Sequence, residues 1–320
     1  MKLRSNIYAP VFFGAILILV GFAPILSRWI GGLSQENFLI DIIVLFLVFL
    51  LPLAFYCRVR NLNLVAVTKV NFVSLRKIPL LLILSLIFAV GSAIFRYLGI
   101  FYLDSSFVDA PGMVTVSSAG NNDFLSLICC IFLPAVLEQT VFFGILMEEY
   151  RPYGTVWALF LSSLMFAMAH LSRENFVYYL FMGIVLAMLN IASDSIVPGV
   201  ILHTGINYSH YYFRSSLIGY LTQAGKTPLL PYLLIAAFLV LIVLLFARLE
   251  NIYRERAYDE MLQTRKEVLR KELERVRREK EAEENPKKYG FFSAFREILL
   301  SPTLLISFAV YFLLVFGIFF

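Results

Sequence analysis

The chain alternates between long apolar stretches and short polar connections over most of its length. Eight apolar stretches occupy 8–30, 38–57, 78–101, 122–149, 154–171, 174–193, 196–222 and 227–249, and a ninth occupies 302–320. A helix of about 20 apolar residues crosses the hydrocarbon core of a bilayer. The pattern therefore predicts an all-α, polytopic integral membrane protein, with an eight-helix core over 1–249 and one further transmembrane helix near its C-terminal end.

One segment between these stretches has a different character. Residues 250–290 form a dense run of charge that is rich in strong helix formers, with Glu and Lys or Arg three or four residues apart. We predict a charged cytoplasmic helix here, followed over 291–320 by an interfacial segment and the ninth span. A solvated helix fits the run better than a coiled coil does. Its exposed length, 250–288, is a candidate surface for a protein partner.

Composition and charge agree with a membrane location. Hydrophobic residues make up 60% of the chain and the mean hydropathy is +0.81, whereas soluble domains are about half apolar. Lys and Arg gather between the second and third stretches and after the eighth, but are absent from 34–37 and 104–123. Because basic loops stay cytoplasmic, we predict a multi-pass protein of the cell membrane with a cytoplasmic N-terminus. Nucleic acid is not an expected partner.

Four of the polar side chains inside the apolar stretches form a candidate set: Glu138, His170, His203 and Asn207. An ionised group at the centre of a bilayer costs roughly 2.5 to 3.5 kcal/mol, so such groups face a protein interior or a wet cavity. His203 and Asn207 are four residues apart, as are Phe166 and His170, and each pair therefore shares one helix face. The spacing predicts one buried site. A carboxylate beside imidazoles and an amide can activate water and stabilise an oxyanion.

The positions of these groups along their helices set a condition on the fold. Glu138 and His170 lie far from the basic turn between their helices, whereas His203 lies close to the start of its own stretch. The groups can therefore meet only if the helices tilt or if the helix of His203 begins late, near Pro198.

Other conspicuous residues have simpler interpretations. Glu148 and Glu149 end the fourth stretch, at the turn to the fifth, where we expect a solvated cap. For Asn190 and His210 we expect hydrogen bonds within the protein interior. The three cysteines have neither the spacing of a disulfide framework nor that of a zinc site.

The motifs of three known intramembrane protease classes are missing from the sequence. There is no HExxH, no GxSG and no GxGD. The polar residues instead resemble the motifs of the CPBP family, the CAAX prenyl protease and bacteriocin-processing membrane proteins. That family's EExxxR, FxxxH and HxxxN motifs correspond, in this order, to Glu138-Gln139-x-x-x-Phe143, Phe166-x-x-x-His170 and His203-x-x-x-Asn207.

The resemblance covers about residues 120–215 and implies an eight-helix fold and an intramembrane endopeptidase. By this resemblance Glu138 and His170 would activate the hydrolytic water, while His203 and Asn207 would stabilise the oxyanion. The substrate would be a membrane-associated peptide or protein. No cofactor is required, although two histidines and a glutamate are also ligands that zinc accepts, which leaves a zinc-dependent mechanism open.

Two positions depart from the family pattern. Gln139 stands where the second glutamate is expected and Phe143 where the arginine is expected. Losing both charges leaves neither one buried without its partner, so Gln139, Phe143 and Phe166 are expected to support the site. The same departures fit a non-catalytic scaffold or pseudoprotease. A transporter or receptor that uses the polar cavity for a ligand is a further alternative.

Overall fold

The structure is a computed structural model of the chain. It describes residues 5–31, 38–71, 78–79, 81–88, 90–91, 123–173, 175–224 and 301–316, together with single residues within 233–248 and 295–299. The secondary structure of these residues is entirely helical, which confirms the predicted all-α class. The predicted charged helix over 250–290 lies outside the described residues.

The N-terminal part contains two long antiparallel helices. The first is α1 (Ser5–Gly31), and the second is a continuous run of α2 (Phe38–Leu45), η2 (Phe46–Leu50) and α3 (Leu51–Arg60). A short helix, α4 (Leu64–Thr68), follows and is capped by Asn63, whose side chain accepts a hydrogen bond from the Ala66 amide at 3.3 Å.

The long central helix is built from five consecutive pieces. These are α6 (Asp123–Ser126), η4 (Leu127–Phe132), α7 (Leu133–Glu138), η5 (Gln139–Leu146) and α8 (Met147–Tyr150). The π-helical segments η2 and η4 come just before Pro52 and Pro134. Proline lacks an N–H and displaces the carbonyl four residues earlier, and a widened turn accommodates that carbonyl without ending the helix.

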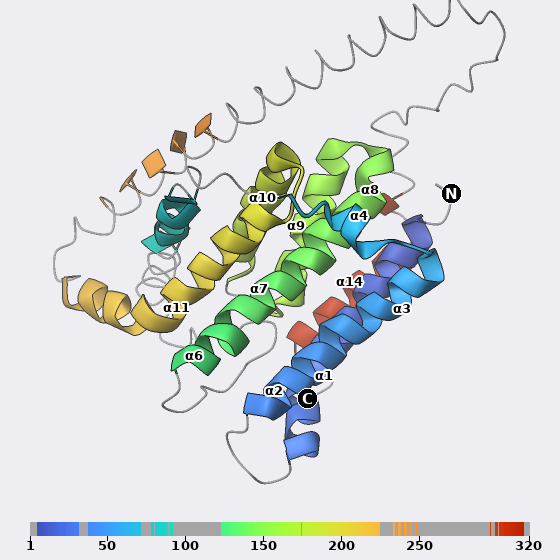
Figure 1. The fold of residues 1–320 in the computed structure, drawn as a ribbon, viewed down its shortest axis with the longest axis horizontal. Coiled ribbons are helices and arrows are strands. Elements are labelled where there is room, and N and C mark those ends of the chain that lie inside the picture. Colours follow the sequence, from blue (N-terminus) through green and yellow to red (C-terminus); the bar gives the residue numbers. More distant parts are fainter. Residues whose placement is uncertain are drawn as a thin grey trace, which may run out of the picture.

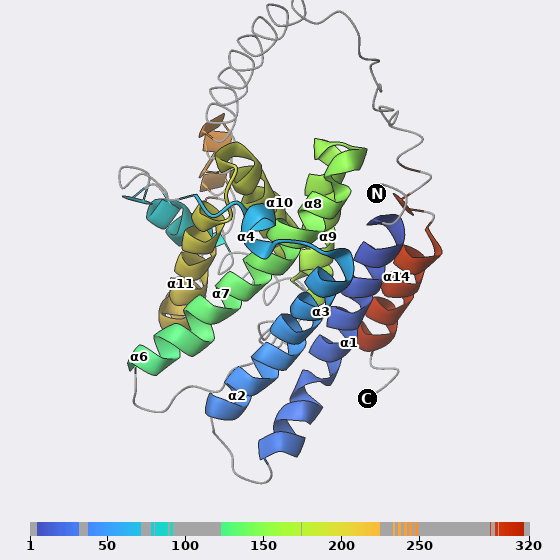
Figure 2. The ribbon, with the colours of Figure 1, turned by 45° about the vertical axis from the view of Figure 1, so that its right-hand side comes forward.

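Three further helices complete the central region. A 3-10 turn, η6 (Arg151–Tyr153), leads into α9 (Thr155–Ala169), and then α10 (Phe176–Ser193) and α11 (Val197–Ala224) follow. Figures 1 and 2 show α7 in the middle, with α1, α3 and α14 (Pro302–Val315) on one side and α10 and α11 on the other. The core is mostly aliphatic and also contains aromatic side chains, of which Phe142 and Phe166 are fully buried.

Helix α14, the observed part of the ninth predicted span, packs along α1. Ser307 Oγ donates a hydrogen bond of 2.8 Å to the Pro10 carbonyl oxygen. Gly14 and Gly21 lie opposite Ser307 and Leu314, and a Cβ atom at Gly21 would come within 2.8 Å of Leu314. Gly14 and Gly21 are seven residues apart, and so are Ser307 and Leu314. The two helices therefore stay in register along this contact.

Four of the described helical stretches are long and apolar enough to cross a membrane: Ile7–Ile30, Ile42–Arg60, Leu127–Tyr153 and Phe176–Ser193. Two shorter apolar helices, Thr155–Ala169 and Pro302–Val315, lie beside them. These helices support a multi-pass membrane protein. The total of nine spans and the cytoplasmic N-terminus remain predictions.

Candidate active site

Glu138 and His203 form the centre of the candidate site. Glu138 is the last residue of α7, and its Oε2 atom lies 3.5 Å from His203 Nε2 on α11. Both residues are buried, with 4% and 2% of their surfaces exposed. Residues that are 65 positions apart in the chain are therefore brought into one polar pair, as the sequence predicts.

The start of α11 near Pro198 agrees with one of the two conditions that the sequence set for this contact. The helix begins at Val197, immediately before Pro198, and reaches His203 within two turns. Directly after Glu138 the central helix widens into the π-helical segment η5. Segments of this kind are frequent at functional sites.

Two atoms of the pair have open hydrogen-bonding capacity. Among the described residues, neither Glu138 Oε2, which is 3.5 Å from His203 Nε2, nor His203 Nδ1 makes a hydrogen bond. Buried polar atoms nearly always have a partner. A water molecule or a polar group of a substrate is the natural partner for both atoms.

His170 is held in one orientation by the way α9 ends. Its backbone N–H turns to the Ala167 carbonyl, which leaves the Phe166 carbonyl to accept a 2.8 Å hydrogen bond from His170 Nδ1. A carbonyl can only accept, so Nδ1 carries the proton and the neutral ring presents Nε2 as an acceptor. The backbone carbonyl one turn before His170 therefore fixes the tautomer.

Tyr179 is a site residue that the sequence analysis did not assign to the site, because a tyrosine pair at 178–179 fits a membrane interface and a cavity wall equally well. Its ring stacks on His170 with a centroid distance of 3.7 Å and an interplanar angle of 20°. The residue lies in the first turn of α10, nine positions beyond His170. Its chemistry in the sequence is that of an ordinary membrane tyrosine, and only the packing of α10 on α9 reveals the contact.

Phe166 lies between the two histidines. Its ring centroid is 4.6 Å from that of His170 and 5.7 Å from that of His203. Phe143, at the position where the family motif has arginine, packs against Phe166 at 5.4 Å. The two phenylalanines, which we expected to support the site, thus form an apolar wall beside the imidazoles of His170 and His203.

Asn207 lies one turn beyond His203 on α11 and contacts the central helix. Its Nδ2 atom donates a 3.3 Å hydrogen bond to the Ile131 carbonyl in η4. One amide hydrogen is thereby engaged with the backbone, and the NH2 group has a second hydrogen for a ligand. The structure therefore gives Asn207 a role in joining helices, whereas its predicted oxyanion contact stays a prediction.

Gln139 is fully buried and pairs with a neighbouring helix. Its Oε1 atom accepts a 3.2 Å hydrogen bond from Asn190 Nδ2 on α10. The expectation that Asn190 forms an interior hydrogen bond is confirmed. Gln139 therefore supports the site through α10.

The expectation that Glu149 is a solvated cap is wrong. Arg60 donates to it twice, from Nε to Oε1 at 3.1 Å and from Nη2 to Oε2 at 2.8 Å. The side chains are only 9% and 6% exposed. Local charge patterns suggested a turn at the surface, but α3 lies against α8 there and supplies the opposite charge from a distant part of the chain.

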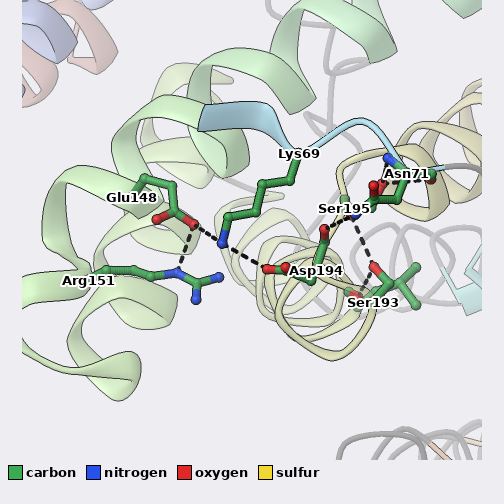
Figure 3. A network of polar contacts seen from close by, with 8 residues as sticks. Lys69, Asn71, Glu148, Arg151, Ser193, Asp194 and Ser195 are labelled. Atoms are coloured by element: carbon green, nitrogen blue, oxygen red, sulfur yellow. Dashed lines mark hydrogen bonds and ion pairs between the residues drawn. The ribbon is translucent and has the colours of Figure 1, made fainter. Parts of the chain in front are cut away.

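A second polar network holds the turn between α10 and α11, at the start of the helix that carries His203. Lys69 Nζ lies 2.8 Å from Asp194 Oδ1, and Glu148 lies 2.8 Å from Arg151 and 3.8 Å from Lys69. Beside them, Ser195 Oγ donates to the Asn71 carbonyl at 2.9 Å. Figure 3 shows these contacts running from α8 through Lys69 to the α10–α11 turn.

The described residues contain no group of three His, Cys, Asp or Glu side chains placed to hold a metal ion. Glu138 and His203 are two potential ligands that lie next to each other, 3.5 Å apart.

Comparison with protein families identifies the region that contains the site. Residues 120–209 match the family model described as type II CAAX prenyl endopeptidase Rce1-like. This segment is an Rce1-like domain of the CPBP family. Searches of the curated proteins and of the solved structures each found no match.

The Rce1-like domain contains every residue assigned to the site from the sequence, from Glu138 to Asn207. The recognition of the CPBP family from the three motifs is therefore confirmed. The domain spans the whole described central helix and ends in the middle of α11, so α1, α3 and α14 lie outside it.

Proposed function

We propose that this protein is an intramembrane endopeptidase that hydrolyses peptide bonds in membrane-associated peptides or proteins. The proposal depends above all on the buried pair of Glu138 and His203, whose Oε2 and Nε2 atoms are 3.5 Å apart within an Rce1-like domain. General-base catalysis needs a carboxylate held within reach of the water that it activates, and the oxyanion needs a fixed donor close by. We assign the first role to Glu138 and the second to His203.

In the proposed reaction Glu138 acts as the general base. It accepts a proton from water while the water oxygen attacks the carbonyl carbon of the peptide bond. His170 accepts a hydrogen bond from the other hydrogen of that water. It does so through Nε2, which is free to accept because Nδ1 carries the ring hydrogen and donates it to the Phe166 carbonyl. When the tetrahedral intermediate collapses, the C–N bond breaks and the proton held by Glu138 passes to the leaving nitrogen. No metal or cofactor takes part.

His203 and Asn207 stabilise the negative charge on the carbonyl oxygen. In the proposed reaction the neutral His203 ring carries its hydrogen on Nδ1 throughout and presents it as a donor, and its Nε2 accepts a hydrogen bond from Glu138 once Glu138 is protonated. Asn207 supplies its second amide hydrogen from the next turn of α11. Fixed donors in a buried site stabilise such an intermediate more strongly than water does.

The substrate class follows from the location of the site. Glu138 lies within a candidate membrane span, and apolar helices surround it. A protein segment that is inserted in the membrane or attached to it can reach such a site. The family description names CAAX prenyl endopeptidases, and our proposal takes from it peptide hydrolysis at the membrane.

The test compares cleavage in membranes that contain the wild type, Glu138→Ala or Glu148→Gln, with new protein termini read by mass spectrometry. We expect termini that appear with the wild type and with Glu148→Gln but disappear with Glu138→Ala. Glu148 is a matched control because it lies on the same helix, outside the site. Identical termini in all three samples would contradict the proposal and favour a non-catalytic scaffold.

A further inference from the structure

A second polar layer lies beside the Glu138–His203 pair. It consists of Gln139 at the start of η5, Asn190 on α10 and Gly199 on α11. Gln139 and Asn190 share a 3.2 Å hydrogen bond and are 0% and 2% exposed. A Cβ atom at Gly199 would lie 2.5 Å from the side-chain oxygen of each amide, so only glycine allows this approach.

This layer and the candidate site are neighbours on the same two helices. Gln139 directly follows Glu138, and Gly199 precedes His203 by four residues, which places both α11 residues on one face. The central helix thus contacts α11 twice in succession. Gln139 meets Gly199, and Glu138 meets His203.

The electrostatics of α11 explain the direction of the two amides. Gly199 lies in the first turn of that helix, where backbone N–H groups lack intrahelical partners and the helix dipole is positive. Both amide oxygens point toward this turn. The interaction therefore draws α7 and α10 together at the point from which α11 leads to His203.

The same amides are costly as packing residues. Among the described residues, Gln139 Nε2 and Asn190 Oδ1 have no hydrogen-bond partner. An unsatisfied buried polar atom destabilises a fold, whereas replacing both partners with apolar groups of similar shape can be neutral or stabilising. A role limited to packing would be served better by two apolar side chains.

We infer that Gln139, Asn190 and Gly199 form a positioning unit that sets the separation of Glu138 and His203. This inference rests on the proposed function and deepens it, because it assigns positioning residues to the same site. The Gln139 and Asn190 amides pack against Gly199 on α11. This contact holds the Glu138 carboxylate and the His203 imidazole at the distance that the reaction needs.

The first test exchanges the two amides in the full-length protein. Gln139→Asn and Asn190→Gln each change the reach of one side chain, whereas the double exchange restores the combined length. With a membrane-protein segment that the wild type is found to cleave, we expect each single variant to lower kcat about tenfold or more, because small displacements in an active site have large effects on rate. KM should change little, and the double exchange should recover most of kcat.

The second test separates positioning from stability. Gln139→Met with Asn190→Leu removes both amides and keeps their approximate volumes. We expect a thermal unfolding midpoint in detergent equal to or above that of the wild type, together with a kcat lowered to about the same extent as in the single exchanges. Gly199→Ala should lower kcat as well, since its methyl group would push α11 away from the amides.

The outcomes separate this inference from the proposed function. Glu138→Ala is measured in the same assay. If Glu138→Ala is inactive but the amide variants retain wild-type kcat, the positioning unit is contradicted and the peptidase stands. A fall in kcat that accompanies an equal rise in KM, or that follows a lowered unfolding midpoint, would also contradict it. Retained cleavage by Glu138→Ala would contradict the proposed function itself.

Discussion

Arg60 and Glu149 form a two-pronged ion pair across 89 residues of sequence, with N–O distances of 3.1 and 2.8 Å. The guanidinium group also lies over the Tyr8 ring, 5.3 Å from its centroid. The pair therefore joins α3 to α8, and its cation also contacts α1. It connects the N-terminal helices to the Rce1-like domain just where the central helix ends.

Breaking this ion pair should destabilise the protein. Glu149→Gln leaves the Arg60 guanidinium buried without its counter-charge, and removing one partner of such a pair costs about 3 kcal/mol. We expect a clearly lowered thermal unfolding midpoint in detergent. Arg60→Met with Glu149→Leu removes both charges and should recover much of the loss. A double variant no more stable than Glu149→Gln would contradict this explanation.

The aromatic contact on His170 should matter for catalysis through its ring and not through its hydroxyl. Tyr179→Phe preserves the 3.7 Å stack, so we expect kcat close to that of the wild type. Tyr179→Leu removes the stack, which is worth about 1 kcal/mol, and should lower kcat several-fold. Steady-state cleavage of one defined substrate measures both variants. Equal losses in the two would point instead to the phenolic oxygen.

The two kinds of contact at the α10–α11 turn should differ in strength. Lys69 and Asp194 are about one third exposed, at 36% and 33%, so Lys69→Met should cost no more than about 1 kcal/mol. Ser195 is buried, and its hydroxyl accepts from the Val197 amide at 3.2 Å at the start of α11. Ser195→Ala should cost about 1 kcal/mol or more, as the loss of a helix cap does. Denaturation midpoints of the two variants, measured together, test this order.

The proposed reaction also predicts how the activity responds to metal chelators. Because the proposed reaction activates water with Glu138 and His170 alone, prolonged treatment with a strong zinc chelator should leave kcat unchanged. A zinc protease known to respond to the chelator serves as the positive control. Activity that is lost on chelation and restored by zinc, but not by magnesium, would show that the metal-dependent alternative is correct.

Short-range regularities explain why part of this architecture could be predicted from the sequence. Apolar stretches of bilayer length gave the helices, and the four-residue spacing of His203 and Asn207 placed them on one face. Their order along the chain, together with Glu138 and His170, identified the family. These signals depend on residues a few positions apart, where helix geometry alone decides what is adjacent.

The contacts that the sequence did not predict join distant segments. Tyr179 reaches His170, and Arg60 reaches Glu149, only because of how α10 and α3 pack. Asn190 was expected to hydrogen-bond, but its partner Gln139 depends on the rotation of η5. A π-helical segment changes that rotation relative to a regular helix, and periodicity does not reveal where such a segment begins.

The pairing of α14 with α1 has a consequence for handling the protein. Without residues 302–316, the recesses at Gly14 and Gly21 would face lipid tails in place of Ser307 and Leu314. Acyl chains are too mobile to fill a notch of one side chain, and they cannot donate to the Pro10 carbonyl as the Ser307 hydroxyl does. Shortened versions of the chain that keep the whole Rce1-like domain but lack this helix would thus expose unfilled recesses on α1. A purification tag should therefore be added to the chain without removing α14.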